Sequence, residues 1–177
     1  MKKVTSLQPR QHQRSPRLLK KINIGIYQGK RIASRVWHSS NVLETARIAA
    51  FLVRHGRNNV WLLTGPLGGG KSTFVRAALK YLGYYGNVPS PTFALSRIYH
   101  LKRGPWKSVI HIDAYRIKGE SEEAALDIAS AVMDPRCLVL IEWPEKLKQR
   151  PWTGPLRLRF SHRKDGGRTI RASGIRP

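Results

Sequence analysis

The sequence predicts a three-layer α/β fold, in which a mostly parallel sheet with antiparallel additions lies between helices. Its 177 residues are enough to bury the core of one domain. Two short apolar runs, at 59–63 and 137–141, have the length of buried parallel strands. Segments 94–100 and 108–112 flank a basic turn, as the strands of an antiparallel hairpin do.

The N-terminal part of the chain differs in composition from the rest. Residues 1–32 are basic and contain no acidic residue, and prolines interrupt any periodicity. We expect a flexible extension over 1–32, with room for a short strand at 20–27, and a compact domain over 33–177. The extension is open to three interpretations: an arm that touches RNA, an organellar targeting segment or a solvated tail.

A strand and a helix are expected before the first apolar run. Residues 32–37 predict an edge strand, and apolar spacing predicts a helix over 42–53. Ser39, Ser40 and Asn41 are candidate N-caps, and Glu44 lies three residues after Asn41 as in a capping box. Gly56 is placed to end this helix.

Further elements are expected after the first apolar run. A helix should begin at Lys71 and stop at Gly83, and the acids at 120–123 should begin another helix. Polar and apolar residues alternate over 156–161, which predicts a half-exposed strand, and 168–172 predicts a last strand. The inner stripe of the later helix is expected to be Ala124, Ala125, Ile128 and Val132.

The loop between the first apolar run and the helix at Lys71 carries the strongest chemical signal. It matches G-x-x-x-x-G-K-[ST], the phosphate-binding loop of P-loop nucleotidases. Glycines let successive backbone N–H groups converge on an anion, and the following helix adds its N-terminal N–H groups. Lys71 would reach the β- and γ-phosphates, and the Ser72 hydroxyl would ligate Mg²⁺. The predicted phosphate-binding residues are Gly65, Gly68, Gly69, Gly70, Lys71, Ser72 and Thr73.

Two acids stand at the ends of predicted core strands. Asp113 follows 108–112, and Glu142 follows 137–141. Ligands bind at the carboxyl edge of open parallel sheets, so both carboxylates can face a metal beside the loop. Thr92 is a candidate switch hydroxyl for the γ-phosphate. The alternatives are ordinary strand-end acids and a turn threonine.

Charge and composition limit the function class. The chain has 33 Lys and Arg against 10 Asp and Glu, a net charge of +23. This charge favours contact with nucleic acid, although a host with uniformly basic proteins would explain it equally well. The single cysteine, Cys137, excludes a disulfide framework and fits a core thiol in a reducing cytoplasm. The sequence has no apolar run long enough to cross a bilayer, so we expect a cytoplasmic protein without a membrane partner.

Four blocks occur in a fixed order along the chain, at 65–76, 90–93, 111–116 and 141–145. Together they resemble the TsaE (YjeE) family, small bacterial ATPases of tRNA threonylcarbamoyladenosine synthesis. The resemblance covers the chain from about residue 33 to its end. It implies an ATPase that uses ATP and Mg²⁺ and acts with the TsaB–TsaD pair in modifying adenosine 37 of tRNA.

The resemblance also implies roles for individual residues. Lys71 and the loop amides would hold the ATP phosphates, and Ser72 would ligate Mg²⁺. Glu142 corresponds to the acid at the metal, and Asp113 corresponds to a second acid of the active site, near the same metal. Thr92 belongs to a switch-like loop over the γ-phosphate.

Other positions are implied less directly or depart from the family pattern. Thr45 and Arg168 would lie near the nucleoside or the phosphates. Pro66 stands where the family usually has Asp, and Gly69 stands where it usually has Ala, which adds freedom to the loop. Phosphate-binding amides come mainly from later in the loop, so we expect phosphate binding to survive.

Two other functions are open. A small-molecule kinase of the same fold needs an acceptor pocket and a lid, and the segment after Glu142 is short with no obvious lid helix. A basic RNA-binding protein without catalysis would have no need for Lys71, Ser72 and both acids together. Direct tRNA contact through the basic surface is compatible with the ATPase as well.

Overall fold

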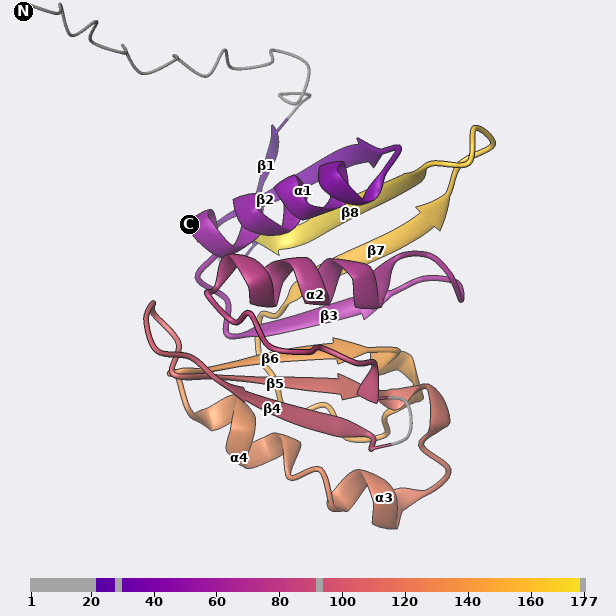
Figure 1. Cartoon of the computed structure of the whole chain (residues 1–177). Coiled ribbons are helices and arrows are strands. Elements are labelled where there is room, and N and C mark those ends of the chain that lie inside the picture. Colours follow the sequence, from indigo (N-terminus) through magenta and orange to yellow (C-terminus); the bar gives the residue numbers. More distant parts are fainter. Residues whose placement is uncertain (1–21, 28–29, 92–93, 176–177) are drawn as a thin grey trace, which may run out of the picture.

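The computed structural model describes residues 22–27, 30–91 and 94–175, and Figure 1 shows their arrangement. The elements in chain order, with η marking a 3₁₀ turn, are β1 (Ile22–Tyr27), β2 (Lys30–Ser39), α1 (Val42–His55), β3 (Val60–Thr64), α2 (Lys71–Tyr81), β4 (Ser96–His100), β5 (Ser108–Asp113), η3 (Ala114–Arg116), α3 (Glu120–Ala124), α4 (Ile128–Met133), β6 (Cys137–Glu142), η4 (Pro144–Lys146), β7 (Leu156–His162) and β8 (Arg168–Ile175).

The strands form one sheet in the order β1-β2-β8-β7-β3-β6-β5-β4. The four strands β7, β3, β6 and β5 run parallel to their neighbours in this series. Antiparallel strands extend the sheet at both ends, with β8, β2 and β1 beyond β7 and β4 beyond β5. The predicted three-layer α/β fold is confirmed, and so is the hairpin of β4 and β5.

The two faces of the sheet contribute to two separate apolar cores. On β6, Leu138 and Leu140 join the core beneath α1 and α2, whereas Val139 and Ile141 join a second core with Ile128 of α4. Because successive side chains of a strand point to opposite faces of the sheet, β6 contributes to both cores. In Figure 1, α1 and α2 lie together over β2, β8, β7 and β3, while α3 and α4 lie beside β4, β5 and β6.

The start of α1 follows the predicted capping box. Asn41 Oδ1 accepts a hydrogen bond from the Glu44 N–H at 2.9 Å, and Glu44 Oε2 accepts one from the Ser40 N–H at 2.7 Å. Gly56 caps the other end, donating its N–H to the Leu52 carbonyl at 2.8 Å. This helix leads directly into β3.

Two expectations about elements are wrong. The segment from 120 to 133 is not one helix: α3 and α4 are separated at Asp127, whose φ is +43°. Ala124 and Ala125 are exposed, and the buried residue of α3 is Glu123. The second error concerns β2, which lies between β8 and β1 and is not an edge strand.

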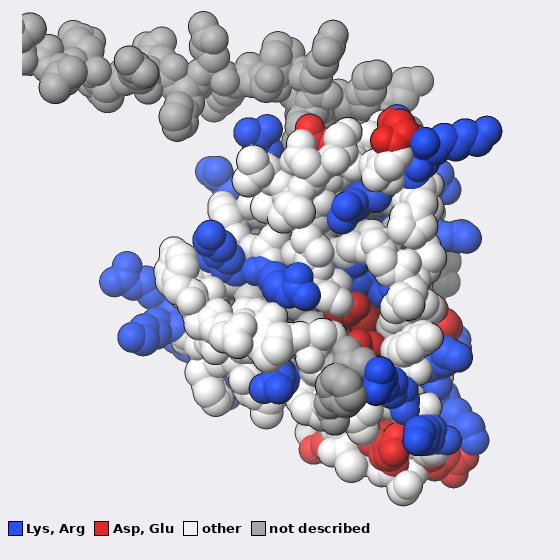
Figure 2. Space-filling view, turned by 45° about the vertical axis from the view of Figure 1, so that its right-hand side comes forward, with Lys and Arg blue, Asp and Glu red and all other residues white. Residues whose placement is uncertain are grey.

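The predicted extension over residues 1–32 falls mainly outside the described residues. Its described part includes β1, which pairs antiparallel with β2 from Ile22 to Tyr27. None of the helices in the described ranges is long and apolar enough to cross a membrane. On the face drawn in Figure 2, Lys and Arg side chains are spread widely, whereas Asp and Glu gather in small groups.

Candidate nucleotide-binding site

The loop between β3 and α2 is shaped by glycines at both of its ends. Gly65 has φ of +135°, and a Cβ at this position would lie 2.4 Å from the carbonyl oxygen of Phe160 on β7. Gly70, with φ of +97°, is the N-cap of α2 and provides no capping side chain. The first N–H groups of α2 are therefore left for a ligand at the helix N-terminus.

Lys71 is the first residue of α2 and is only 4% exposed. Its Nζ donates hydrogen bonds to the carbonyl oxygens of Gly65 and Pro66, each at 2.9 Å, and lies 3.9 Å from the ring centroid of Trp143. Burial lowers the pKa of Lys71, and nearby carboxylates, above all that of Glu142, act in the opposite direction. An ammonium has three donors, so one remains for a phosphate.

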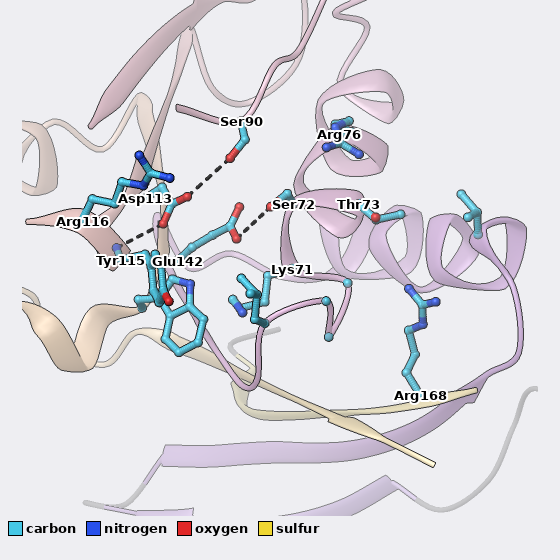
Figure 3. A pocket seen from close by; sticks show the side chains of 16 residues that line it. Lys71, Ser72, Thr73, Arg76, Ser90, Asp113, Tyr115, Arg116, Glu142 and Arg168 are labelled. Atoms are coloured by element: carbon cyan, nitrogen blue, oxygen red, sulfur yellow. Dashed lines mark hydrogen bonds between the residues drawn. The ribbon is translucent and has the colours of Figure 1, made fainter. Parts of the chain in front are cut away.

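The two predicted acids lie side by side at the carboxyl edge of the sheet. Asp113 ends β5, Glu142 ends β6, and the two residues are paired in the register of these strands. Ser72 Oγ donates to Glu142 Oε2 at 3.0 Å, as Figure 3 shows. The structure thus brings the P-loop hydroxyl and the β6 carboxylate together.

The other oxygen of Glu142 has a different partner. His111 Nε2 lies 2.9 Å from Glu142 Oε1, and both side chains are almost fully buried. A carboxylate accepts hydrogen bonds, so the imidazole donates from Nε2 in this contact. The contact leaves Glu142 Oε2 directed to Ser72.

This arrangement fits Mg²⁺ and does not fit a metal held entirely by protein. Among the described residues there is no group of three or more His, Cys, Asp or Glu side chains that could hold a metal ion. Mg²⁺ commonly takes one or two protein oxygens together with phosphate oxygens and waters. Ser72 Oγ and Glu142 Oε2 are the oxygens that would hold it here.

Asp113 is fixed by hydrogen bonds to both of its oxygens. Oδ1 accepts from the Tyr115 N–H at 3.1 Å, and Oδ2 accepts from Ser90 Oγ at 3.4 Å. The Tyr115 ring also packs against that of Trp143 at a tilt of 44°, with ring centroids 5.0 Å apart. The carboxylate therefore forms a fixed wall of the site next to Glu142.

These groups surround a pocket of about 640 Å³. Nine of the predicted site residues line it, namely Gly68, Gly69, Gly70, Lys71, Ser72, Thr73, Asp113, Glu142 and Arg168. A phosphate loop, a fixed lysine and an oxygen pair suited to Mg²⁺ thus share one cavity. A sequence model of the family described as "Threonylcarbamoyl adenosine biosynthesis protein TsaE" matches residues 39–170.

The chain belongs to the TsaE family.

Relatives named tRNA threonylcarbamoyladenosine biosynthesis protein TsaE occur in several bacteria. The Streptomyces coelicolor protein is 36% identical over 118 residues, which are 66% of this chain and 76% of that protein. The Rickettsia bellii protein is 38% identical over 107 residues, 59% of this chain and 71% of that protein. The Rickettsia prowazekii protein is 40% identical over 92 residues, 51% of this chain and 60% of that protein.

A solved structure shares the fold. Bacillus subtilis YdiB superposes with a TM-score of 0.61 at 23% identity, covering 82% of this chain and 88% of the YdiB chain. This likeness concerns the fold alone.

Three residues predicted for the TsaE site lie elsewhere or outside the described ranges. Gly65 does not line the pocket, although its carbonyl accepts from Lys71. Thr45 is fully buried in α1 and does not line the pocket either; its Oγ1 lies 2.8 Å from Ser39 Oγ. Thr92 is not among the described residues.

Arg168 approaches the phosphate loop from β8, and Figure 3 shows it on the side of the pocket opposite Asp113. A Cβ on Gly70 would lie 2.5 Å from a terminal guanidinium nitrogen of Arg168. Gly70 is thus favoured by its positive φ, whereas the flexible end of Arg168 could move away from a side chain at this position. The guanidinium is placed to add positive charge at the start of α2.

The two departures from the TsaE pattern inside the loop are structurally linked. The Pro66 carbonyl accepts a hydrogen bond from the Gly69 N–H at 3.1 Å, and a Cβ on Gly69 would lie 2.9 Å from that same oxygen. Alanine would crowd this turn. Gly69 therefore has a packing role that the sequence comparison alone did not suggest.

Several lining residues were not predicted. Val42, Leu67, Arg76 and Arg116 line the pocket with Tyr115. His111 was missed as the partner of Glu142, although it lies two residues before Asp113 on one strand, so that alternation places both on one face.

Proposed function

We propose that this TsaE-family protein is a Mg²⁺-dependent ATPase that supports threonylcarbamoyl modification of adenosine 37 in tRNA, acting with a TsaB–TsaD-like pair in the cytoplasm. The observation that carries the proposal is the 3.0 Å contact between Ser72 Oγ and Glu142 Oε2 beside the phosphate loop. The relatives from Streptomyces coelicolor and Rickettsia prowazekii, both named as tRNA threonylcarbamoyladenosine biosynthesis proteins, support the pathway.

The phosphates of ATP would be held by the loop. The N-terminal N–H groups of α2 and the remaining Lys71 donor provide positive partial charge where the β- and γ-phosphates lie. Bound Mg²⁺ would neutralise phosphate charge, with Ser72 and Glu142 as its protein ligands. Arg168 and the exposed Val42 side chain also line the pocket and would be available to the nucleoside.

Hydrolysis also requires a group that orients water. Asp113 is suited to this role, because its carboxylate is buried next to Glu142 and is held by the Tyr115 N–H. Ser90 Oγ contacts the same carboxylate, so the segment just before Thr92 lies beside Asp113. We propose Thr92 as the sensor of that phosphate.

The proposal is tested by measuring Mg²⁺-dependent release of phosphate from ATP, with and without the partner pair. Lys71→Ala and Glu142→Gln should each lower turnover by roughly a hundredfold. Glu120→Gln is the matched control, because it makes the same chemical change at an exposed position of α3 and should leave turnover unchanged. Equal turnover in wild type, Lys71→Ala and Glu142→Gln would refute the site assignment.

The same assay separates the kinase alternative. If the γ-phosphate appeared on a metabolite and not as inorganic phosphate, the protein would be a kinase. ATP turnover by the protein alone is expected to be weak and to rise when the partner pair is added.

A further inference from the structure

A second hollow lies on the sheet face that is turned away from α1 and α2. Along β7, Leu156, Leu158 and Phe160 are buried in the core beneath these helices. Arg157 and Arg159 alternate with them and are exposed on the other face.

The neighbouring strand adds another cation at the same level. Arg171 of β8 is exposed and is paired directly with Arg159 in the register of the two strands. On the other side of β7, Thr64 at the end of β3 is paired with Arg159. Two guanidiniums therefore emerge from adjacent strands at one point of the sheet.

The segment after η4 completes a hollow of about 430 Å³ over these strands. It contributes Arg150 and the half-buried Trp152, and Glu145 is the one acidic residue in the lining. We call this site the arginine surface, consisting of Arg150, Trp152, Arg157, Arg159 and Arg171.

The arginines are not explained by ion pairing. In the part of the chain that the structure describes, the ion pairs involve other side chains, and none joins an arginine of this surface to an acid. Like charges directly opposite on neighbouring strands disfavour the folded state. An excess of basic residues would place cations on exposed positions in general; it would not make four of them converge on one hollow with an indole.

The surface lies next to the nucleotide pocket and outside it. Trp143 lines the nucleotide pocket, whereas the next two residues, Pro144 and Glu145, line the hollow that contains the arginine surface. Thr64 lines the same hollow and is followed by the first glycine of the phosphate loop. A molecule bound here would leave the pocket open for a nucleotide.

We propose that the arginine surface binds the sugar–phosphate backbone of RNA, with Trp152 stacking against a base. Guanidinium groups match phosphate oxygens with paired hydrogen bonds, and an aromatic ring among cations is suited to an unpaired base. An acidic protein surface could pair with the arginines as well, but an aromatic ring set among cations favours RNA, whose bases stack on such rings. The RNA is identified as tRNA only through the proposed function.

The test is the affinity of the full-length protein for an unmodified tRNA transcript, measured by fluorescence anisotropy at several KCl concentrations. Arg159→Gln/Arg171→Gln should weaken binding by roughly tenfold, and the slope of log affinity against log salt should fall by about two. The matched control is Lys102→Gln/Arg103→Gln, which removes the same charge from the exposed β4–β5 turn. That control should change affinity by less than about twofold.

Trp152→Ala separates stacking from charge. It should weaken binding several-fold while the salt slope stays unchanged, because no phosphate contact is removed. Unfolding temperatures of all variants are measured alongside; removing two opposed arginines should not lower that of the Arg159→Gln/Arg171→Gln variant.

Two results would overturn the proposal. If both double variants weakened RNA binding equally, only net charge would matter. If Arg159→Gln/Arg171→Gln kept its RNA affinity but lost binding to the partner pair, the surface would contact protein. Neither result depends on ATP hydrolysis. A protein without ATPase activity could still bind RNA through this surface, and an active ATPase could lack RNA binding, so the two proposals can fail separately.

Discussion

The two carboxylate oxygens of Glu142 have separate partners, and this separation determines what the side chain can do. Oε1 accepts from His111 within the core, while Oε2 accepts from Ser72 at the edge of the pocket. A carboxylate held in this way would present one oxygen to a metal in a fixed direction. We therefore expect His111 to be a positioning residue that acts through Glu142.

The role of His111 is tested by two substitutions. His111→Ala should raise the Mg²⁺ concentration for half-maximal ATP turnover by about tenfold, because Glu142 loses its fixed orientation. His111→Gln keeps an N–H donor and should restore part of the effect. Mg²⁺ titration of steady-state turnover measures both. If the two variants had the wild-type Mg²⁺ dependence, His111 would only fill space in the core.

The sequence predicts a residue of the candidate site when a motif or the end of a strand determines where that residue lies. Lys71 and Ser72 follow from the loop pattern, and Asp113 and Glu142 follow from the rule that parallel strands place their ends together. Thr45 does not line the pocket: helical spacing does not show that its hydroxyl contacts Ser39. The contact of His111 with Glu142 joins two strands 31 residues apart, which no local pattern contains.

Among the elements, α3 shows most clearly how a distant contact overrides a local pattern. The acids at 120–123 predicted a long helix with an alanine stripe, yet the helix ends after five residues. Glu123 turns inward, and its oxygens accept from the Lys148 N–H at 3.0 Å and the Gln149 N–H at 2.6 Å. The carboxylate thereby fixes the segment that leads from η4 to β7, which the sequence around Glu123 does not indicate.

Glu123→Ala should consequently destabilise the fold. Two backbone N–H groups would lose a charged acceptor, and we expect the free energy of unfolding to fall by about 2 kcal/mol. Urea unfolding followed by circular dichroism measures the change. The control is Glu120→Ala in the same helix, whose exposed pair with Lys148 should contribute less than about 1 kcal/mol. Equal losses in the two variants would mean that the inward contacts of Glu123 contribute no more than a surface ion pair.

For the whole molecule, basic residues outnumber acidic residues by more than three to one, with a net charge of +23. The ion pairs among the described residues include three between exposed or partly exposed partners and one that is charged only if His111 is protonated. On the face drawn in Figure 2, basic side chains are spread widely, and only some of them lie beside acidic groups. We therefore expect repulsion between like charges to outweigh surface ion pairing in the folded state.

This balance predicts the sign of the salt dependence of stability. The screening length falls from about 30 Å at 0.01 M salt to about 10 Å at 0.1 M, so added KCl weakens long-range repulsion more than short contacts. We expect the unfolding temperature to rise by roughly 2–4 °C over this range, equivalent to about 1 kcal/mol. Differential scanning fluorimetry in chloride buffers, which avoid phosphate at the loop, measures the shift.

Sucrose at equal osmolarity is the control for effects other than screening. A fall in unfolding temperature with KCl would mean that ion pairs dominate and that the basic surface is less self-repelling than its net charge implies.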